Sequence, residues 1–237
     1  MIRKFYSAFA AFALVCTAVL AQAQPLRPEP YQLGRDYFLL QEPLTVRDPS
    51  KIEVMEIFRY GCIHCYHFDP MVKKWEKTLA SDVDFYRLPV VWDAETALQA
   101  RALFTAQAFG IGPQIHDEIF NAIWTAPGGP APLNSVARIK QLFAAQGVDG
   151  DKFDKVFEKS AAINSKVNEA KQRLLAYKPQ PDTPSMGTPE MLVAGKYRIS
   201  GAAFHVTSEH EAFAKMLEVA DYLIAMERKE KAEKSAK

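Results

Sequence analysis

The sequence predicts an α/β protein in which a block of helices interrupts a sheet-forming domain. A strand–helix–strand pattern near the start, a long helical stretch in the middle, and a hairpin followed by a helix at the end support this prediction. Of the 237 residues, 49% are hydrophobic and 24% are charged. This composition is typical of a soluble globular protein, and the length allows one domain that carries an inserted second one.

The first 23 residues have the three parts of a secretory signal peptide. Arg3 and Lys4 give a positive start, residues 5–20 are mostly apolar, and Ala21-Gln22-Ala23 offers the small residues that a signal peptidase reads. An uncleaved membrane anchor is the alternative, but the apolar run is short for a span of about 20 residues. We therefore expect an exported protein.

The overall charge argues against a nucleic-acid binder. The chain has 29 Lys and Arg against 28 Asp and Glu, a formal net charge of +1, whereas nucleic-acid-binding proteins usually have a clear basic excess. A charge near zero, without an obvious interface, favours a monomer.

The first part of the chain predicts strands around one helix. Residues 37–40 predict a short strand, and residues 52–58 alternate apolar and acidic side chains before becoming apolar, as in a strand entering a buried sheet. From Phe68 to Leu79, apolar residues recur at helical spacing. Residues 83–91 predict the next strand, and the strand–helix–strand order implies that the two long strands pair in parallel.

The middle of the chain predicts a helical block that ends at a proline-rich loop. Its helices are expected over residues 94–109, 114–124, 136–145, 151–157 and 163–175. We find no internal repeat of fixed period in this block.

The last part of the chain predicts a hairpin and a long helix. Residues 191–193 and 196–199 flank Ala194-Gly195, a turn that needs positive φ at both positions, for which alanine is a poor residue. The final helix carries apolar residues at helical spacing. Its mixed-charge end, residues 227–234, is expected to be solvated and to fray.

These elements divide the chain into four parts. They are a signal peptide (1–23), the first part of the sheet-forming domain (24–93), the helical insertion (94–178), and the second part of the sheet-forming domain with its C-terminal helix (179–237).

The chemistry of the chain is expected at Cys62 and Cys65, where a strand meets a helix. A disulfide between them would close too short a loop to stabilise the fold, because long loops gain most from closure. A C-x-x-C pair beside a β-α-β pattern instead indicates a redox dithiol. Unpaired N–H groups and the helix dipole stabilise a Cys62 thiolate and lower its pKa. Cys65 is expected to be shielded.

His64 lies between the two cysteines and is expected to stabilise the Cys62 thiolate further, if it is cationic or donates a hydrogen bond. Stabilising the thiolate stabilises the reduced form, so the disulfide becomes an oxidant.

An inert structural disulfide and a zinc site are the alternatives at this position. Cys62, His64, Cys65 and His67 are potential zinc ligands close together. Structural zinc sites, however, usually draw ligand pairs from separated segments, and the other histidines are scattered along the chain. We therefore expect no metal.

Four blocks of the sequence together match a known family. They are Tyr31 to Tyr37, the active-site block Glu56 to Tyr66, the loop Gly187-Thr188-Pro189, and Val193 to Tyr197. On these blocks the chain resembles the DsbA family of periplasmic thiol:disulfide oxidoreductases. The resemblance implies a thioredoxin fold with an inserted all-helical domain, strong oxidising power, and no organic cofactor.

The resemblance also assigns roles around the cysteine pair. Pro189 matches a cis-proline of the family, which implies that the Thr188 backbone lies beside Cys62 and pairs with an extended substrate segment. Glu56 matches a buried acidic residue that aids proton transfer beneath the disulfide, and burial would raise its pKa toward neutrality. Pairing of Glu56 with a cation such as Arg87 is the alternative.

Two positions depart from the family pattern. Ile63 replaces the more usual proline between the cysteines, and Pro70 is expected to kink the active-site helix. Both leave the redox potential open and neither changes the assignment.

The resemblance implies a periplasmic dithiol oxidase that acts through Cys62 and Cys65. Reduced, unfolded exported proteins would be its substrates, and a quinone-linked membrane protein of the DsbB type would reoxidise it. A disulfide reductase or isomerase is the nearest alternative. A metal-binding module using Cys62, His64 and Cys65, and a redox-inert chaperone, are more distant ones.

Overall fold

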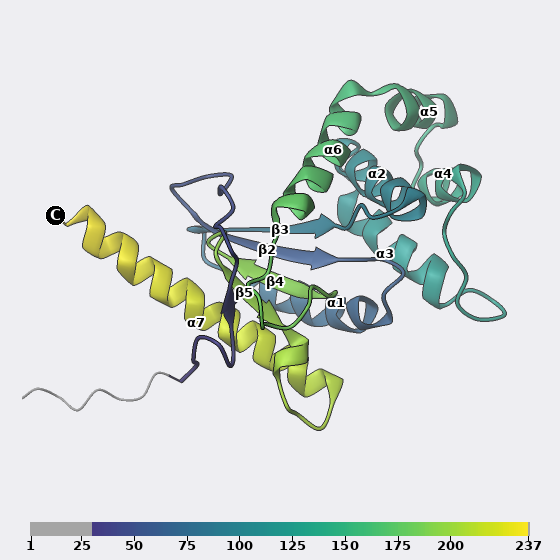
Figure 1. Cartoon of the computed structure of the whole chain (residues 1–237). Helices are drawn as coiled ribbons and strands as arrows, with labels where there is room; N and C mark the ends of the chain where they lie inside the picture. Colours follow the sequence, from purple (N-terminus) through teal and green to yellow (C-terminus); the bar gives the residue numbers. More distant parts are fainter. Residues whose placement is uncertain (1–29, 237) are drawn as a thin grey trace, which may run out of the picture. The chain divides into compact units, whose positions relative to one another are not determined.

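The computed structural model describes residues 30–236, so the expected signal peptide lies outside the described residues. Tyr31–Lys237 forms one compact unit around a five-stranded sheet of order β1-β5-β4-β2-β3 (Figure 1). β2 pairs in parallel with β3, as predicted, and antiparallel with β4. The strands are β1 (Phe38–Leu39), β2 (Ile52–Phe58), β3 (Val83–Pro89), β4 (Glu190–Val193) and β5 (Tyr197–Ser200).

Helices cover both faces of the sheet, with α1 and α7 on one face and α2 and α6 on the other (Figure 1). The helical block from α2 to α6 lies between β3 and β4 in the chain. None of the helices in the described part is long and apolar enough to cross a membrane. The helices are α1 (Ile63–Glu76), α2 (Ala94–Ala108), α3 (Gly112–Trp124), α4 (Val136–Ala145), α5 (Gly150–Lys159), α6 (Ala161–Ala176), the 3-10 turn η1 (Gly201–Ala203) and α7 (Glu209–Ser235).

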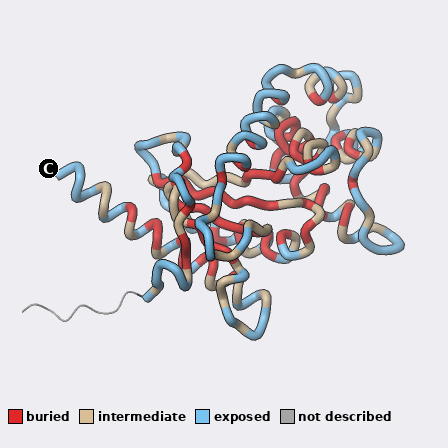
Figure 2. Tube along the Cα trace, viewed as in Figure 1, coloured by how far each residue is buried: buried red, intermediate tan, exposed pale blue. Residues whose placement is uncertain are grey.

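β2 is buried along its whole length (Figure 2). Val54 packs with residues of α1 and α7, whereas Met55 and Ile57 pack with residues of α2 and α6. Because both faces are covered, the strand is almost continuously apolar. The two carboxylates that interrupt it, Glu53 and Glu56, are both buried.

A further apolar cluster joins the helical block to the carboxyl end of β2. Phe58, Tyr60, Cys62 and Cys65 pack with aliphatic and aromatic side chains of α2, α3, α4 and α5. The helical block therefore forms part of the surroundings of the cysteine pair.

The predicted hairpin is present, including its unusual alanine. Ala194 and Gly195 both have positive φ, 52° and 68°, as a turn matching the twist of β4 and β5 requires. A Cβ on Gly195 would lie 2.3 Å from the carbonyl oxygen of Leu44. Gly195 is therefore required by both its backbone conformation and this close approach.

The charged end of α7 is largely exposed, as expected, but it also has partners that the charge pattern did not predict. The helix continues to Ser235, and Glu227 is buried and pairs with Lys196 at 2.7 Å. Lys231 donates a hydrogen bond to the carbonyl of Lys51 at 2.6 Å. These partners lie far away in the sequence, so the local charge pattern gave no sign of them.

A buried ion pair holds the loop that precedes β4. Arg198 and Glu190 are both fully buried and lie 2.5 Å apart. Arg198 also donates to the carbonyl of Ser185, and Glu190 accepts from the amide of Gly187 and from the Tyr177 hydroxyl. Since both charges are fully hydrogen bonded, the pair fixes the loop against the sheet.

We expect Arg198→Met to lower the free energy of unfolding by about 3–5 kcal/mol, because it leaves the Glu190 carboxylate buried without its cation. Urea unfolding measures the change. Arg228→Met is the matched control: it breaks the half-exposed pair with Asp82 and should cost no more than about 1 kcal/mol. Equal losses for the two variants would contradict a structural role for the buried pair.

Candidate active site

Cys62 lies at the N-terminus of α1, as the sequence predicted. It is the N-cap residue, and the helix begins at Ile63, well before the apolar pattern that starts at Phe68. Cys62 is 8% exposed and Cys65, one turn further in, is fully buried. Both are free thiols in this structure. Cys62 is therefore the sulfur that an incoming thiolate can reach.

The surroundings of Cys62 lower the pKa of its thiol from 9.0 to about 5. The largest cause is a hydrogen bond from the Cys65 thiol. A side-chain hydrogen bond with Thr188 and the amides of Cys65 and His64 at the start of α1 add to it, while burial opposes them. Burial, followed by the neighbouring Cys62, raises the pKa of Cys65 well above its ordinary value. At neutral pH the reduced pair therefore carries one negative charge, on Cys62.

The loop before β4 faces the cysteine pair. The Thr188–Pro189 peptide bond is cis, as the resemblance predicted. Sγ of Cys62 lies 3.1 Å from the Thr188 carbonyl oxygen, across 126 positions of sequence, and donates a hydrogen bond to it when the thiol is protonated. The structure therefore brings together the two elements that the sequence predicted to face one another.

A groove of about 320 Å³ opens beside these elements. Four residues with polar side chains, His64, Thr188, Ser200 and Glu209, line it, and much of the remaining wall is apolar. The apolar lining includes Pro189, Ala202, Ala212 and Phe213.

The imidazole of His64 is bound by Glu209, the first residue of α7. The Glu209 carboxylate pairs with Nδ1 of His64 and, at 2.7 Å, with Nδ1 of His67. The backbone amide of His64 is one of the groups that lower the Cys62 pKa. Glu209 was not predicted, because 145 residues separate it from His64 and no local pattern links them.

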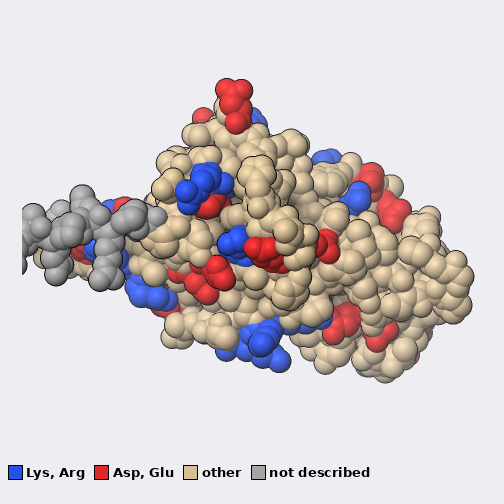
Figure 3. All heavy atoms as spheres, turned by 90° about the horizontal axis from the view of Figure 1, so that it is seen from below, with Lys and Arg blue, Asp and Glu red and all other residues tan. Residues whose placement is uncertain are grey.

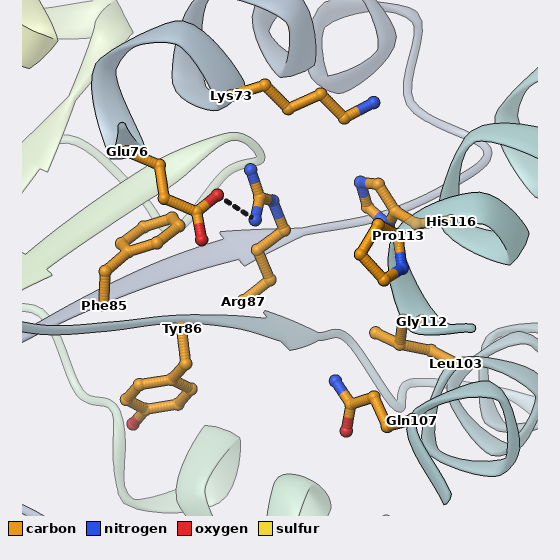
Figure 4. Close-up of a pocket in the computed structure, with 10 residues that line it drawn as sticks. All are labelled: Lys73, Glu76, Phe85, Tyr86, Arg87, Leu103, Gln107, Gly112, Pro113 and His116. Atoms are coloured by element: carbon orange, nitrogen blue, oxygen red, sulfur yellow. Dashed lines mark hydrogen bonds and ion pairs between the residues drawn. The ribbon is translucent and has the colours of Figure 1, made fainter. Parts of the chain in front are cut away.

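Glu56 is buried on β2 and also lies beside a cation. Burial raises the pKa of Glu56 to about 7, although Nε of Arg87 lies 3.2 Å from its Oε2 and opposes the shift. Figure 4 shows that Arg87 also reaches Glu76, in a pocket of about 270 Å³. Glu56 in turn raises the pKa of Cys65. Glu56 thus has both features that the sequence analysis treated as alternatives.

A buried polar cluster beside the site was not predicted from the sequence either. His116 of α3 is hydrogen bonded to Tyr60 and Asp69. A lone histidine in an amphipathic helix gives no sequence signal for these partners. Among the described residues, no group of three or more His, Cys, Asp or Glu side chains is arranged to hold a metal ion.

Comparisons with known proteins show the family. No protein-family model matches the chain. It is 34% identical over 212 residues to the thiol:disulfide interchange protein DsbA of Azotobacter vinelandii, covering 89% of this chain and 91% of the relative. It is 33% identical over 219 residues to DsbA of Pseudomonas aeruginosa, covering 91% and 96%. The chain belongs to the DsbA family.

Solved DsbA structures share the fold. The crystal structure of Pseudomonas aeruginosa DsbA matches with a TM-score of 0.73 at 32% identity, over 85% of this chain and 97% of that one. DsbA from Xylella fastidiosa gives a TM-score of 0.68 at 29% identity, over 81% and 95%. The thioredoxin fold with a helical insertion is confirmed, and this DsbA family member is a thiol:disulfide oxidoreductase.

We expect the Cys62 thiol to titrate near pH 5, as followed by thiolate absorbance and by the rate of alkylation. Because folding lowers this pKa, the thiolate stabilises the reduced protein fully above the ordinary value of 9.0, and the stabilisation is lost as pH falls toward 5. The oxidised protein lacks this contribution. A reduced protein whose Cys62 titrates near 9, or whose stability follows that of the oxidised form over this range, would contradict the assignment.

Proposed function

We propose that this protein is a periplasmic dithiol oxidase that introduces disulfide bonds into reduced, unfolded exported proteins through Cys62 and Cys65. The low pKa of Cys62 is the observation that carries the proposal. A stabilised thiolate favours the reduced pair, so the Cys62–Cys65 disulfide readily accepts two electrons from a substrate. A reductase would need the disulfide to be favoured over the reduced pair.

The reaction proceeds through two exchanges. A substrate thiolate attacks Sγ of Cys62, the Cys62–Cys65 bond breaks, and Cys65 leaves with the electron pair. A second substrate thiolate then attacks the substrate sulfur of this mixed disulfide, and Cys62 leaves as a thiolate. The substrate loses two electrons and gains a disulfide, while the protein gains two electrons and is released as the dithiol.

Glu56 supplies a proton to the departing Cys65. The raised pKa of Cys65 means that this sulfur takes up a proton once the disulfide opens. A buried carboxyl with a pKa of about 7 carries a proton for much of the time at neutral pH. Arg87 then stabilises the carboxylate that remains.

The groove accepts an extended substrate segment of varied sequence. The Thr188 backbone pairs with the backbone of the segment, and the apolar groove wall takes side chains that differ between substrates. Figure 3 shows cationic and anionic groups interspersed on one face of the molecule, with few charges at the right-hand end of the view. Apolar contact and backbone pairing give broad specificity.

The reduced pair is reoxidised by a quinone-linked membrane protein of the DsbB type, and the protein acts as a monomer without an organic cofactor or metal. Isomerase, reductase and metal-binding functions are the other outcomes of the tests below. Zinc retained through purification without thiol exchange would favour the metal-binding function.

We expect Cys62→Ser to abolish oxidation of a dithiol peptide, because it removes the attacked sulfur. Cys65→Ser should also block turnover, but because it keeps Cys62 it should accumulate a mixed disulfide with substrate when supplied with an oxidised peptide. Peptide fluorescence measures the rate, and non-reducing electrophoresis detects the adduct. If Cys62→Ser still oxidised the peptide at the wild-type rate, the proposed mechanism would be wrong.

We expect Glu56→Gln to slow oxidation on the order of a hundredfold below pH 7, where the protonated carboxyl donates. In the wild type, the rate of disulfide opening per substrate thiolate should fall as pH rises through about 7. The variant should lack this pH dependence. Stopped-flow reduction of the disulfide measures both. Glu53→Gln, a buried carboxylate of β2 that pairs with Arg173, should keep the wild-type profile.

A further inference from the structure

His116 reaches from the helical block into the active-site region. It belongs to α3, is 4% exposed, and lies among the rings of Phe58, Tyr60 and Phe120 at centroid distances of 5.1 to 5.3 Å. Its Nδ1 lies 2.8 Å from the Tyr60 hydroxyl and its Nε2 lies 3.0 Å from Oδ1 of Asp69. Both partners are buried.

The charges around His116 determine which atom donates in each bond. Burial lowers the pKa of His116, so the imidazole is neutral and carries one N–H. Burial raises the pKa of Asp69, but hydrogen bonds from His116 and Lys73 outweigh it and keep the carboxylate ionised. Nε2–H therefore donates to Asp69, and Nδ1 accepts from the Tyr60 hydroxyl. Each polar atom in the chain Tyr60–His116–Asp69 has the partner that its protonation state requires.

The two partners belong to the segments that carry the cysteines. Tyr60 lies in the turn that leads to Cys62, and Asp69 lies on α1, whose N-terminus holds the Cys62 thiolate. The same helix α3 binds Tyr60 at a second atom, because Nε1 of Trp124 donates to the Tyr60 carbonyl at 2.9 Å. Helix α3 thus contacts the turn at two points, the Tyr60 side chain and the Tyr60 carbonyl. Figure 4 shows His116 extending from α3 at the edge of the pocket that contains Arg87.

We propose that His116 is a positioning residue that stabilises the reduced state of the cysteine pair more than the oxidised state. In the oxidised protein, the covalent bond to Cys65 fixes Cys62 on α1. In the reduced protein that bond is absent, and the position of Cys62 depends on non-covalent anchoring of the turn through Tyr60. A contact that acts mainly in the reduced state makes the disulfide a stronger oxidant, because the potential reflects the difference in stability between the two states.

The inference rests on Cys62–Cys65 being the redox pair, as proposed above. His116→Phe fills the aromatic cluster but leaves the Tyr60 hydroxyl and Asp69 without this partner. We expect it to lower the equilibrium constant for oxidation of glutathione by about three- to tenfold. This is the worth of one net hydrogen bond, because of the two bonds lost only the one to Tyr60 anchors the turn that leads to Cys62. We also expect it to raise the pH at which Cys62 titrates and to destabilise the reduced form more than the oxidised form in urea unfolding.

Three further variants separate positioning from packing. His116→Gln keeps one donor and one acceptor and should restore most of the equilibrium constant. Tyr60→Phe removes only the hydroxyl and should reproduce the effect of His116→Phe, which keeps the test valid if His116→Phe does not fold. Phe120→Leu disturbs the same cluster without removing a hydrogen bond, and should destabilise both redox states equally and leave the constant unchanged.

The outcomes distinguish this inference from the proposed function. If His116→Phe and Tyr60→Phe destabilise both states equally and leave the glutathione constant within twofold of the wild type, His116 is a packing residue and the inference is wrong. If the wild-type protein itself does not exchange with glutathione through Cys62, the proposed function fails before any variant is compared.

Discussion

The active site depends on one interaction, the stabilisation of the Cys62 thiolate at the start of α1. The amides of His64 and Cys65 are free to bind the Cys62 sulfur because the first N–H groups of a helix have no partner within it. Cys65 adds its thiol proton from one turn further in, and burial keeps that proton in place. Hydrogen bonds to the Cys62 sulfur outweigh its burial, whereas burial dominates at Cys65, so the two cysteines have opposite pKa shifts.

The rest of the fold brings a second element to that sulfur. Thr188 is far from Cys62 in the sequence, and pairing of β4 with β2 places its carbonyl beside the Cys62 sulfur. The buried pair of Arg198 and Glu190 fixes the loop, because Glu190 accepts from the amide of Gly187. Pairing within the sheet brings Thr188 close to Cys62, and the ion pair holds the loop in that position.

Local features were predicted best. The bounds of Ile52–Phe58 and Val136–Ala145 match the predicted ranges, because apolar periodicity follows burial directly. The start of α1 was predicted from the chemistry of Cys62 and not from periodicity, since the first turn carries chemically active residues and the apolar pattern begins only at Phe68. Partners such as Glu209 and His116 were missed, because a polar contact between distant segments depends on the tertiary structure and leaves no periodic signal.

Two roles that the sequence suggested for Glu56 as alternatives depend on one another in the structure. Pairing with Arg87 and service in proton transfer were treated as alternatives, but a fully buried carboxyl with no cation nearby would remain protonated far above neutral pH. Such a group would hold its proton at neutral pH and would be a poor proton donor to Cys65. Arg87 lowers the pKa, burial raises it, and the balance lies at about 7. The ion pair is therefore what makes the carboxyl able to exchange protons at the pH where the cysteines react.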